Sequence, residues 1–386
     1  MGDVRIEIAP GVASLDRVAW NAVVADDSPF LEWEWLASLE DAGCLGARSG
    51  WQARPLVAFR GDRLVAACPL YAKSNSEGEF VFDHAFADAA ERAGLAYYPK
   101  LLVGAPFTPV TGGRLLVHPA LGEAEAEALR AAMAEALVSI AAESGLSSVH
   151  VNFCREAEAA GLEHAGFLRR VGIQYHWHNE GYADFDDYLG RFRSKRRNQV
   201  RRERRDVRAQ GVCVEVHADG DIDDALFEPM YAFYLSTIRA RYWGRQYLNR
   251  AFFDLLRERF RERLVFVVAR RDGAPVAGAF NVAKGDALYG RYWGEADHVR
   301  NLHFEVCYYA GIEHCIERGL ARFEPGAGGE YKQVRGFDAR PTFSAHRFLD
   351  ERLHAAVARF LEQERMHAAR AIEHLHEQSA LKPATA

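Results

Sequence analysis

The sequence predicts an α/β (α+β) fold made of two copies of one unit that mixes strands and helices. Residues 56–71 (LVAFRGDRLVAACPLY) contain two strand-like segments around a Gly-Asp turn. Residues 265–280 (VFVVARRDGAPVAGAF) repeat this pattern around Asp272 and Gly273, and a short turn between two such segments is typical of a β-hairpin. A chain of 386 residues is long enough for two domains.

Each copy begins with two predicted helices. In the first copy they cover residues 18–24 and 32–42, and in the second they cover 227–239 and 250–262. A hairpin, further strands and a long helix follow in both copies. This order alternates too irregularly for a doubly wound parallel sheet.

The long helices provide a second sign of repetition. They are predicted at residues 121–143 and 304–318, and they stop at Gly145-Leu146 and Gly319-Leu320. A glycine directly after a helix is the usual C-terminal cap. Both copies therefore share the same helix-to-strand transition.

The second copy starts in a different way from the first. After a junction near residues 178–190 comes a strongly basic segment, 191–208, and a terminal helix is predicted at 350–378. We expect an N-terminal domain of residues 1–180 and a C-terminal domain of residues 181–386.

Charge is distributed very unevenly along the chain. The formal net charge is −6, but residues 191–208 carry ten Lys or Arg against Glu203 and Asp206, a local charge of +8 that leaves −14 for the remainder. Such a body would repel indiscriminate nucleic-acid binding, so we expect no DNA partner. Only six of the 48 basic residues are Lys.

Several classes of protein are disfavoured. No run approaches the roughly 20 apolar residues of a membrane-spanning helix, and the start MGDVRIEIAPG is unlike a signal peptide. The six cysteines form no CxxC pair, and the histidines match no metal-binding pattern. We expect a cytoplasmic protein without a metal, and the sequence leaves its oligomeric state open.

The basic segment has helical periodicity. Arginines at 193, 197, 201, 204 and 208 form a stripe beside an apolar edge made by residues 189, 192, 200 and 207. Regularly spaced guanidinium groups suit the phosphates of tRNA or of a nucleotide-linked precursor. The alternative is a solvated helix with internal Arg/Glu pairs.

Six segments resemble signatures of the bacterial FemAB-like family. They are residues 96–115, 172–177 (GIQYHW), 241–248 (RYWGRQYL), 288–294 (LYGRYWG), 302–311 (LHFEVCYYAG) and 324–337 (EPGAGGEYKQVRGF). The resemblance spans roughly residues 15–365. It implies two tandem GNAT-like acyltransferase domains and transfer of an acyl group to an amine. In the better understood Fem relatives, aminoacyl-tRNA is the donor and a peptidoglycan precursor is the acceptor.

An acetyl-CoA-dependent GNAT enzyme holds pyrophosphate on a glycine-rich turn before its central helix. Here that position corresponds to Glu295–His303 (EADHVRNLH), which contains no glycine, and residues 112–124 of the first copy lack the spacing. We therefore expect aminoacyl-tRNA as the donor and no separate cofactor, with acetyl-CoA or acyl-CoA as the alternative.

Acyl transfer requires an oxyanion-stabilising group and a base. By position in the family motif, Lys332 takes the first role, and the alternative is a surface lysine on a strand edge. Glu330 lies two residues earlier and shares its face if the stretch is extended. His303 and Glu305 are rival bases.

The remaining candidates are expected to contact substrate. The basic helix contributes Arg193, Lys195, Arg197 and Arg201; the aromatic segments contribute Arg241, Trp243, Tyr247, Arg291, Tyr292, Tyr331 and Arg335; and the first copy contributes Lys100, Thr108, Gln174, Tyr175 and His176. Packing among the aromatic residues is the alternative for the second group. We expect the first-copy residues to line an acceptor groove or the cleft between the copies.

Three functions remain open at this point. The first is an aminoacyltransferase that acts on a peptide or cell-wall precursor. The second is an acyl-CoA-dependent N-acetyltransferase that acts on a small-molecule amine. The third is a non-catalytic module that binds RNA or a precursor, because a fold alone does not establish catalysis.

Overall fold

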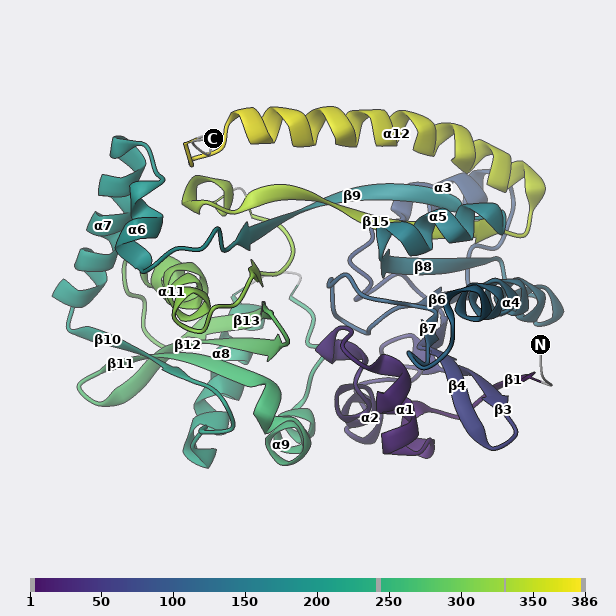
Figure 1. Cartoon of the computed structure of the whole chain (residues 1–386), viewed down its shortest axis with the longest axis horizontal. Coiled ribbons are helices and arrows are strands. Elements are labelled where there is room, and N and C mark those ends of the chain that lie inside the picture. Colours follow the sequence, from purple (N-terminus) through teal and green to yellow (C-terminus); the bar gives the residue numbers. More distant parts are fainter. Residues whose placement is uncertain (1–3, 241–243, 330, 383–386) are drawn as a thin grey trace. The chain divides into compact units, whose positions relative to one another are not determined.

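A computed structural model of the chain describes residues 4–240, 244–329 and 331–382. It divides into two compact units (Figure 1), the first made of residues 1–173 and 341–370 and the second of residues 174–340 and 371–386. A contiguous division at 180/181, as the sequence suggested, omits this return of the chain to the first unit. The return cannot be read from the repeat, because β-strand partners far apart in sequence leave no local signal.

Unit 1 contains two groups of strands. One is the antiparallel sheet β1 (Val4–Ile8), β3 (Leu56–Arg60), β4 (Arg63–Cys68) and β7 (Leu116–Val117), in the order β1-β3-β4-β7. The other has the order β9-β15-β8-β6-β5-β2, with β2 (Trp51–Ala53), β5 (Leu70–Lys73), β6 (Lys100–Val103), β8 (Ser148–Cys154), β9 (Leu168–His178) and β15 (Asp338–Phe348). Strands β6 and β8 are parallel.

Five helices complete unit 1, together with most of α12 (Glu351–Glu377). They are α1 (Arg17–Val24), α2 (Trp33–Asp41), α3 (His84–Arg92), α4 (Glu123–Glu143) and α5 (Glu156–His164). The core is formed where Met133 and Leu137 of α4 pack against Val149 and Val151 of β8, all of them less than 1% exposed. Burial of each such side chain stabilises the unit by about 1.5–3 kcal/mol.

Unit 2 contains the basic helix and the second hairpin. Its helices are α6 (Phe185–Gly190), α7 (Ser194–Ala209), α8 (Phe227–Arg239), α9 (Arg250–Arg259), α10 (Leu302–Phe304) and α11 (Ala310–Glu317). Its strands are β10 (Val212–His217), β11 (Leu264–Arg271), β12 (Ala274–Lys284), β13 (Ala287–Glu295) and β14 (Arg322–Glu324), in the order β10-β11-β12-β13-β14-β9. Of the pairs in this series, β13 and β14 run parallel.

Both predicted hairpins are confirmed. The turn between β11 and β12 consists of Asp272 and Gly273, with φ of 52° and 79°. Two successive residues with positive φ match the twist of the flanking strands, which is why Asp-Gly is a strong hairpin signal. The glycine caps are confirmed as well, because Gly145 and Gly319 have φ of 65° and 67° after α4 and α11.

The long helix predicted at 304–318 differs from the expectation. Residues Glu305–Tyr309 form a π-helical turn between α10 and α11, a feature that often marks functional sites. Helices α3, α5 and α6 were not predicted, because each is at most nine residues long and covers few helical turns. None of the described helices is long and apolar enough to cross a membrane.

Candidate functional site

The carboxyl end of β14 is the point where the sheet of unit 2 opens. Strand β13 pairs with β14 only through Ala287–Tyr289, whereas its pairing with β12 continues to Glu295. Pro325, which has no N–H, follows Glu324 and ends the ladder. The two parallel strands therefore separate just after Tyr289 and Glu324.

Glu324 is a buried carboxylate at this opening. Arg322 donates from Nε to Glu324 Oε1 at 3.0 Å, and His176 of β9 lies across the sheet with its Nε2 3.8 Å from Glu324 Oε2. Burial raises the pKa of Glu324 to about 7, against the opposing effect of Arg322. The sequence shows this residue only as the first letter of EPGAGG, and we did not predict a role for it.

His176 shares this environment and is neutral at physiological pH. Burial, followed by the nearby charges of His178, Arg322, Arg340 and Lys332, lowers its pKa to about 3. Since Glu324 retains affinity for a proton near neutrality and His176 does not, the pair is poised with the carboxylate as the stronger base.

Lys332 lies in the glycine-rich segment after β14. Its side chain is buried, with the residue 3% exposed, and Nζ donates to the carbonyl oxygen of Gly326 at 2.5 Å. Gly326 and Gly329 have φ of 86° and 95°, a region that glycine adopts without strain. Burial lowers the pKa of Lys332 to about 8. The lysine is thus neither on the surface nor on a strand edge.

The neighbourhood of Lys332 is not extended backbone. A short 3₁₀ helix, Gln333–Arg335, begins directly after it. Tyr331 and Lys332 form a turn, so the expected extended stretch is not found at Lys332. Glu330 itself lies outside the described residues, as do Arg241 and Trp243.

His303 occupies an aromatic environment close to Lys332. Its ring lies edge-on to Trp293 at 4.5 Å and to Tyr308 at 5.3 Å between centroids. Burial and the charges of Arg335 and Lys332 lower its pKa to about 4. His303 is therefore neutral near pH 7, with weak affinity for a proton.

Glu305 is not available as a base. It is 5% exposed, and Arg204 of α7 donates from Nε to both of its carboxylate oxygens, at 3.0 and 3.2 Å. Arg204 also binds Glu313 of α11 at 2.6 Å. The prediction that Glu305 is a rival base needs correction, since it joins the π-helical turn to the basic helix.

Arg335 also differs from its expected role. It is 3% exposed and donates from Nη2 to both carboxylate oxygens of Glu203 at 2.9 and 3.0 Å, while its Nε donates to the hydroxyl of Tyr309 at 2.9 Å. Its guanidinium also stacks on Phe304, 3.4 Å from the ring centroid. This network ties α7 to the π-helical turn, so Arg335 positions the site instead of contacting substrate.

The basic helix α7 keeps part of its charge exposed. Val200 and Val207 are buried, as the apolar edge predicts. Arg193, Lys195 and Arg201 are exposed and Arg197 is half-buried. Arg201 pairs with Asp186 of α6 at 3.0 Å, and α6 and α7 lie side by side (Figure 1).

The aromatic candidates of unit 2 lie mainly in packed surroundings. Tyr292 contacts Tyr234 with ring centroids 4.9 Å apart, and the Arg291 guanidinium lies 5.2 Å from the centroid of its ring. The backbone N–H of Tyr247 donates to the Tyr234 hydroxyl at 3.2 Å. Tyr331 is 64% exposed, and it therefore remains accessible beside Lys332.

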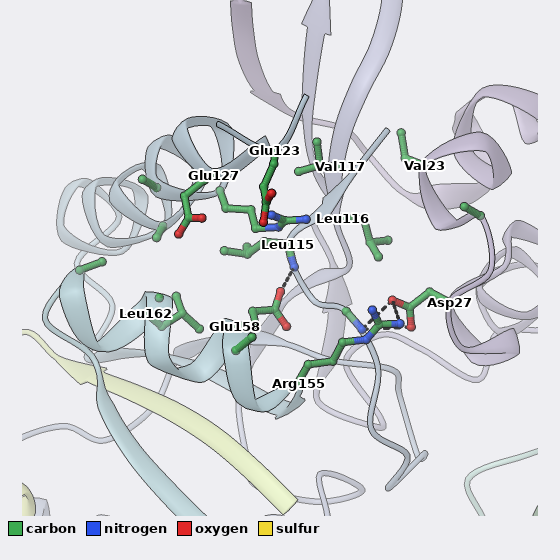
Figure 2. A pocket seen from close by; sticks show the side chains of 18 of the residues that line it. Val23, Asp27, Leu115, Leu116, Val117, Glu123, Glu127, Arg155, Glu158 and Leu162 are labelled. Carbon is green, nitrogen blue, oxygen red and sulfur yellow. Dashed lines mark hydrogen bonds and ion pairs between the residues drawn. The ribbon is translucent and has the colours of Figure 1, made fainter. Parts of the chain in front are cut away.

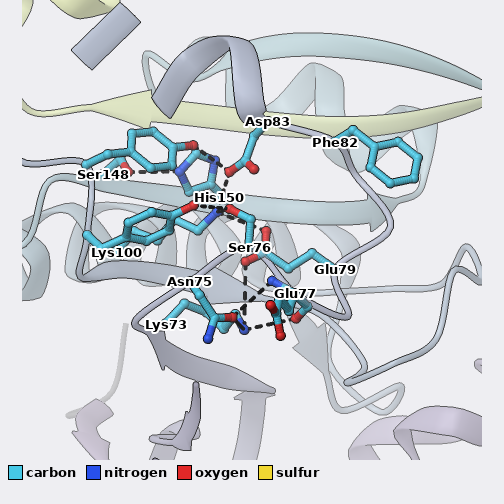
Figure 3. Close-up of polar contacts among 12 residues, drawn as sticks. Lys73, Asn75, Ser76, Glu77, Glu79, Phe82, Asp83, Lys100, Ser148 and His150 are labelled. Atoms are coloured by element: carbon cyan, nitrogen blue, oxygen red, sulfur yellow. Dashed lines mark hydrogen bonds and ion pairs between the residues drawn. The ribbon is translucent and has the colours of Figure 1, made fainter. Parts of the chain in front are cut away.

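Lys100 is a buried ion-pair partner in unit 1 (Figure 3). It is less than 1% exposed and donates to Glu79 at 2.9 Å, to Asp83 and to Ser76 at 3.0 Å. The prediction that Lys100 lines a groove is wrong, because its three partners hold it inside the fold. The same cluster includes Lys73, which sits 4.2 Å from the ring centroid of Trp51.

The other first-copy candidates are also largely enclosed. Thr108 is 2% exposed and donates to the carbonyl of Pro106 at 2.9 Å, so it shapes its own loop. Gln174 is buried, and Tyr175 and His176 are half-buried. Of these residues, the structure brings only His176 to the opening of the sheet in unit 2.

A cavity of about 690 Å³ lies in unit 1 between α1, β7, α4 and α5 (Figure 2). At its floor, Asp27 accepts from the backbone N–H of Gly113 at 2.9 Å, and Glu158 accepts from Arg114 and Leu115 at 2.8 and 2.5 Å. Three successive amides, in the stretch where a phosphate-binding turn would be expected, are thus occupied by the chain's own carboxylates. The first turn of α4 adds Glu123 and Glu125, which disfavour a phosphate there.

No group of three or more metal-ligating side chains occurs in the described part of the chain. The ionisable groups near the opening of β13 and β14 include the carboxylate of Glu324, the imidazole of His176 and the ammonium of Lys332. This set can take up a proton and stabilise a developing negative charge, which is what transfer of an acyl group to an amine requires.

Comparisons with known proteins agree with this chemistry. A sequence profile of the family FemAB_like, described as peptidoglycan biosynthesis/recognition, matches residues 11–383. A search of curated proteins found no match.

Solved structures share the fold at low sequence identity. A crystal structure of FemX is 12% identical, with 89% of this chain and 98% of that chain covered and a TM-score of 0.57. A C-terminal domain assigned to a lysylphosphatidylglycerol synthetase from Agrobacterium fabrum is 12% identical, with 89% and 94% covered and a TM-score of 0.54. A tandem GNAT protein from the clavulanic acid biosynthesis pathway is 14% identical, with 89% and 98% covered and a TM-score of 0.44. The likeness to FemX, which covers 89% of this chain, confirms the expected mixed fold of two tandem units.

Proposed function

The chain belongs to the FemAB-like family of acyltransferases, and we propose that it transfers an aminoacyl group from aminoacyl-tRNA to an amine of a peptide or cell-wall precursor. The observation that carries this proposal is Lys332, whose buried ammonium is held by the Gly326 carbonyl beside the end of β14. A compact positive charge at this place suits the oxyanion that forms when an amine attacks an acyl carbon. In a partly desolvated site its effect is larger than in water.

The choice of donor rests on two features. The exposed basic side chains of α7, Arg193, Lys195 and Arg201, supply charge for a phosphate-rich ligand. In the described residues, the two stretches that correspond to the phosphate turn of a CoA enzyme, 112–124 and 295–303, lack its glycine spacing, and the amides of residues 113–115 already bind Asp27 and Glu158. Both features favour tRNA over CoA.

The test measures acyl transfer directly. Purified protein is incubated with a pool of radiolabelled aminoacyl-tRNAs and a lysine-containing tripeptide, and in parallel with radiolabelled acetyl-CoA and the same tripeptide. We expect labelled tripeptide from the tRNA pool alone. Transfer from acetyl-CoA alone would contradict the choice of donor, and no transfer from either donor would contradict the proposed function.

Variants of two lysines separate catalysis from general charge. Lys332→Met should lower the transfer rate by roughly 10²–10³-fold, as removal of one oxyanion donor does in other acyl-transfer enzymes. Lys284→Met, a change of the same type at the last residue of β12, is the matched control and should leave the rate unchanged. Equal effects of both changes would argue against a catalytic Lys332.

A further inference from the structure

We propose that Glu324 and His176 form the subsite for the acceptor amine, and that Glu324 Oε2 removes the proton of that amine as it attacks the acyl carbon. This inference rests on the proposed function and adds the base that it lacks. The ligand that the subsite would take is a primary amine, because Glu324 Oε2 accepts hydrogen bonds and His176 Nε2 accepts one in the tautomer that carries its proton on Nδ1.

Two facing side-chain atoms at this opening are buried without hydrogen-bond partners in the described part of the chain. Glu324 Oε2 and His176 Nε2 are both buried, and neither has a hydrogen-bond partner among the described residues. They lie 3.8 Å apart, which is longer than a hydrogen bond. Buried polar atoms without partners are destabilising, and a ligand that donates to both atoms would remove this cost.

The sheet places these two atoms on neighbouring strands, at the end of the pairing between β13 and β14. Glu324 is the last residue of β14, at the point where β13 departs, and His176 is its neighbour on β9, because β14 and β9 pair through Phe323 and Trp177. The ammonium of Lys332 is fixed to Gly326, two residues beyond Glu324. A base and an oxyanion-stabilising cation thus lie on the same short segment of chain.

The carboxylate of Glu324 is fixed in orientation through one of its two oxygens. Arg322 holds only Oε1, at 3.0 Å, and is itself held by the Tyr289 hydroxyl at 2.9 Å. Oε2 is therefore left for a ligand while the carboxylate cannot rotate freely. The raised pKa of about 7 gives Glu324 useful basicity near neutral pH.

The other predicted bases are less suitable. Glu305 has both oxygens bound by Arg204, and His303 has a pKa lowered to about 4. Glu330 lies outside the described residues. The charged and titratable groups around Glu324 and its partners are Arg322, Asp286, Tyr289, His176, His178, Lys332 and Arg340.

The proton and bond balance of the step is simple. The amine nitrogen forms a bond to the acyl carbon, and the ester bond between that carbon and the ribose oxygen of the donor breaks. The acceptor enters as an ammonium, so one of its protons goes to solvent before the attack, and the second, released as the new bond forms, passes to Glu324 Oε2. Glu324 then gives this proton to the ribose oxygen, which departs as a hydroxyl, and Glu324 returns to its ionised form.

The experiment compares two nucleophiles that differ in their need for a base. Acyl transfer from the aminoacyl-tRNA pool is measured with the lysine-containing tripeptide, whose amine is protonated near neutral pH, and with hydroxylamine, which is largely unprotonated. Glu324→Gln should slow transfer to the tripeptide by roughly 10²–10⁴-fold and transfer to hydroxylamine by less than about tenfold. Glu324→Asp, which keeps a carboxylate, should restore part of the tripeptide rate.

The matched control is Glu215→Gln. It removes a carboxylate that pairs with Arg270 at 3.1 Å on β10 and β11, and it should leave both rates unchanged. If wild-type protein is active and Glu324→Gln retains tripeptide transfer, or slows transfer to both nucleophiles equally, the assignment of Glu324 is wrong while the proposed function stands. If wild-type protein is inactive with both nucleophiles and both donors, the proposed function fails first.

Discussion

At the scale of single residues, two buried lysines have pKa values shifted in opposite directions, because their partners differ. Lys100 is surrounded by Glu79 and Asp83, and their charges raise its pKa in spite of burial. Lys332 has a carbonyl as its partner, and burial lowers its pKa to about 8. A lysine between carboxylates is a fixed structural charge, whereas one beside a carbonyl is an ammonium that can respond to a ligand.

The pH dependence of acyl transfer follows from two of these groups. Glu324 acts as a base only when ionised, above its pKa of about 7, and Lys332 stabilises an oxyanion only when protonated, below its pKa of about 8. We expect a narrow, bell-shaped profile of kcat/KM against pH with its maximum between these values. Lys332→Arg should remove the alkaline limb, because guanidinium stays protonated. A profile flat from pH 6 to 9 would contradict both assignments.

The buried cluster of unit 1 allows a prediction about stability. Lys100→Met leaves Glu79 and Asp83 buried without their main partner, so we expect a decrease of about 3–5 kcal/mol in the free energy of unfolding at pH 7. Urea denaturation followed by circular dichroism measures this decrease. Lys284→Met is the control and should cost far less.

The same cluster predicts acid sensitivity with a definite sign. Burial opposes ionisation of Asp83, but nearby groups, of which Lys100 has the largest effect, keep its pKa below the ordinary value of 3.8. A carboxylate with a depressed pKa contributes stability above its unfolded pKa, and this contribution disappears as pH falls further. Unfolding monitored from pH 7 to pH 2 should show this decrease in wild-type protein and a smaller one in Asp83→Asn.

At the scale of elements, the basic helix has two faces with different tasks. Glu203 and Arg204 bind Arg335, Tyr309, Glu305 and Glu313, and these contacts fix α7 to the π-helical turn. The exposed face carries further positive charge, of which Arg201 pairs with Asp186 of α6. The one acidic residue buried in the helix is therefore an anchor, which is why α7 is more than a solvated helix.

The two faces of α7 predict how removal of its exposed charges affects tRNA binding. The double change Arg197→Ala and Arg201→Ala should weaken binding and lower the slope of log K against log salt by about 0.7–0.9 for each phosphate that the helix no longer neutralises. Filter binding at several salt concentrations gives the slope. Arg202→Ala with Arg205→Ala removes two exposed charges of the same helix and serves as the matched control. Identical effects of both pairs would indicate non-specific attraction.

Strand β13 and helix α8 meet at a position that only glycine fits. A Cβ at Gly294 would lie 1.8 Å from the carbonyl oxygen of Phe233, whereas one at Gly290 would lie 3.1 Å from Pro325 Cα. Gly294→Ala must displace α8 and should cost about 1–3 kcal/mol or more in the free energy of unfolding. Gly290→Ala should cost less, and thermal melting compares the two. Equal melting temperatures would contradict this packing argument.

At the scale of the whole molecule, the two units share an architecture but differ in what they leave available. In unit 1, Asp27 and Glu158 bind the backbone amides of residues 113–115, and the paired lysines are buried. In unit 2, the opening of β13 from β14 is accompanied by Glu324 and His176, with one unpartnered atom each among the described residues. The repeat thus specifies two similar scaffolds, while the ionisable groups at the strand opening belong to one of them.

The sequence by itself determined the repeat, both hairpins, the glycine-capped helices, the buried edge of α7 and the membership of the FemAB-like family. These features depend on neighbouring residues, through turn chemistry and periodicity, so they can be read locally. It also singled out Lys332, by its place in a motif.

Only the tertiary structure decided which candidates are partners of one another. Glu305 was predicted to be a base and Arg335 to contact substrate, yet each binds a charge on α7, about a hundred residues or more away in the chain. Glu324 was overlooked because its raised pKa comes from burial, and its place next to His176 comes from the pairing of β14 with β9. Desolvation and pairing arise when distant segments pack together, and for this reason the chemistry of the site, unlike its scaffold, could not be predicted from local sequence.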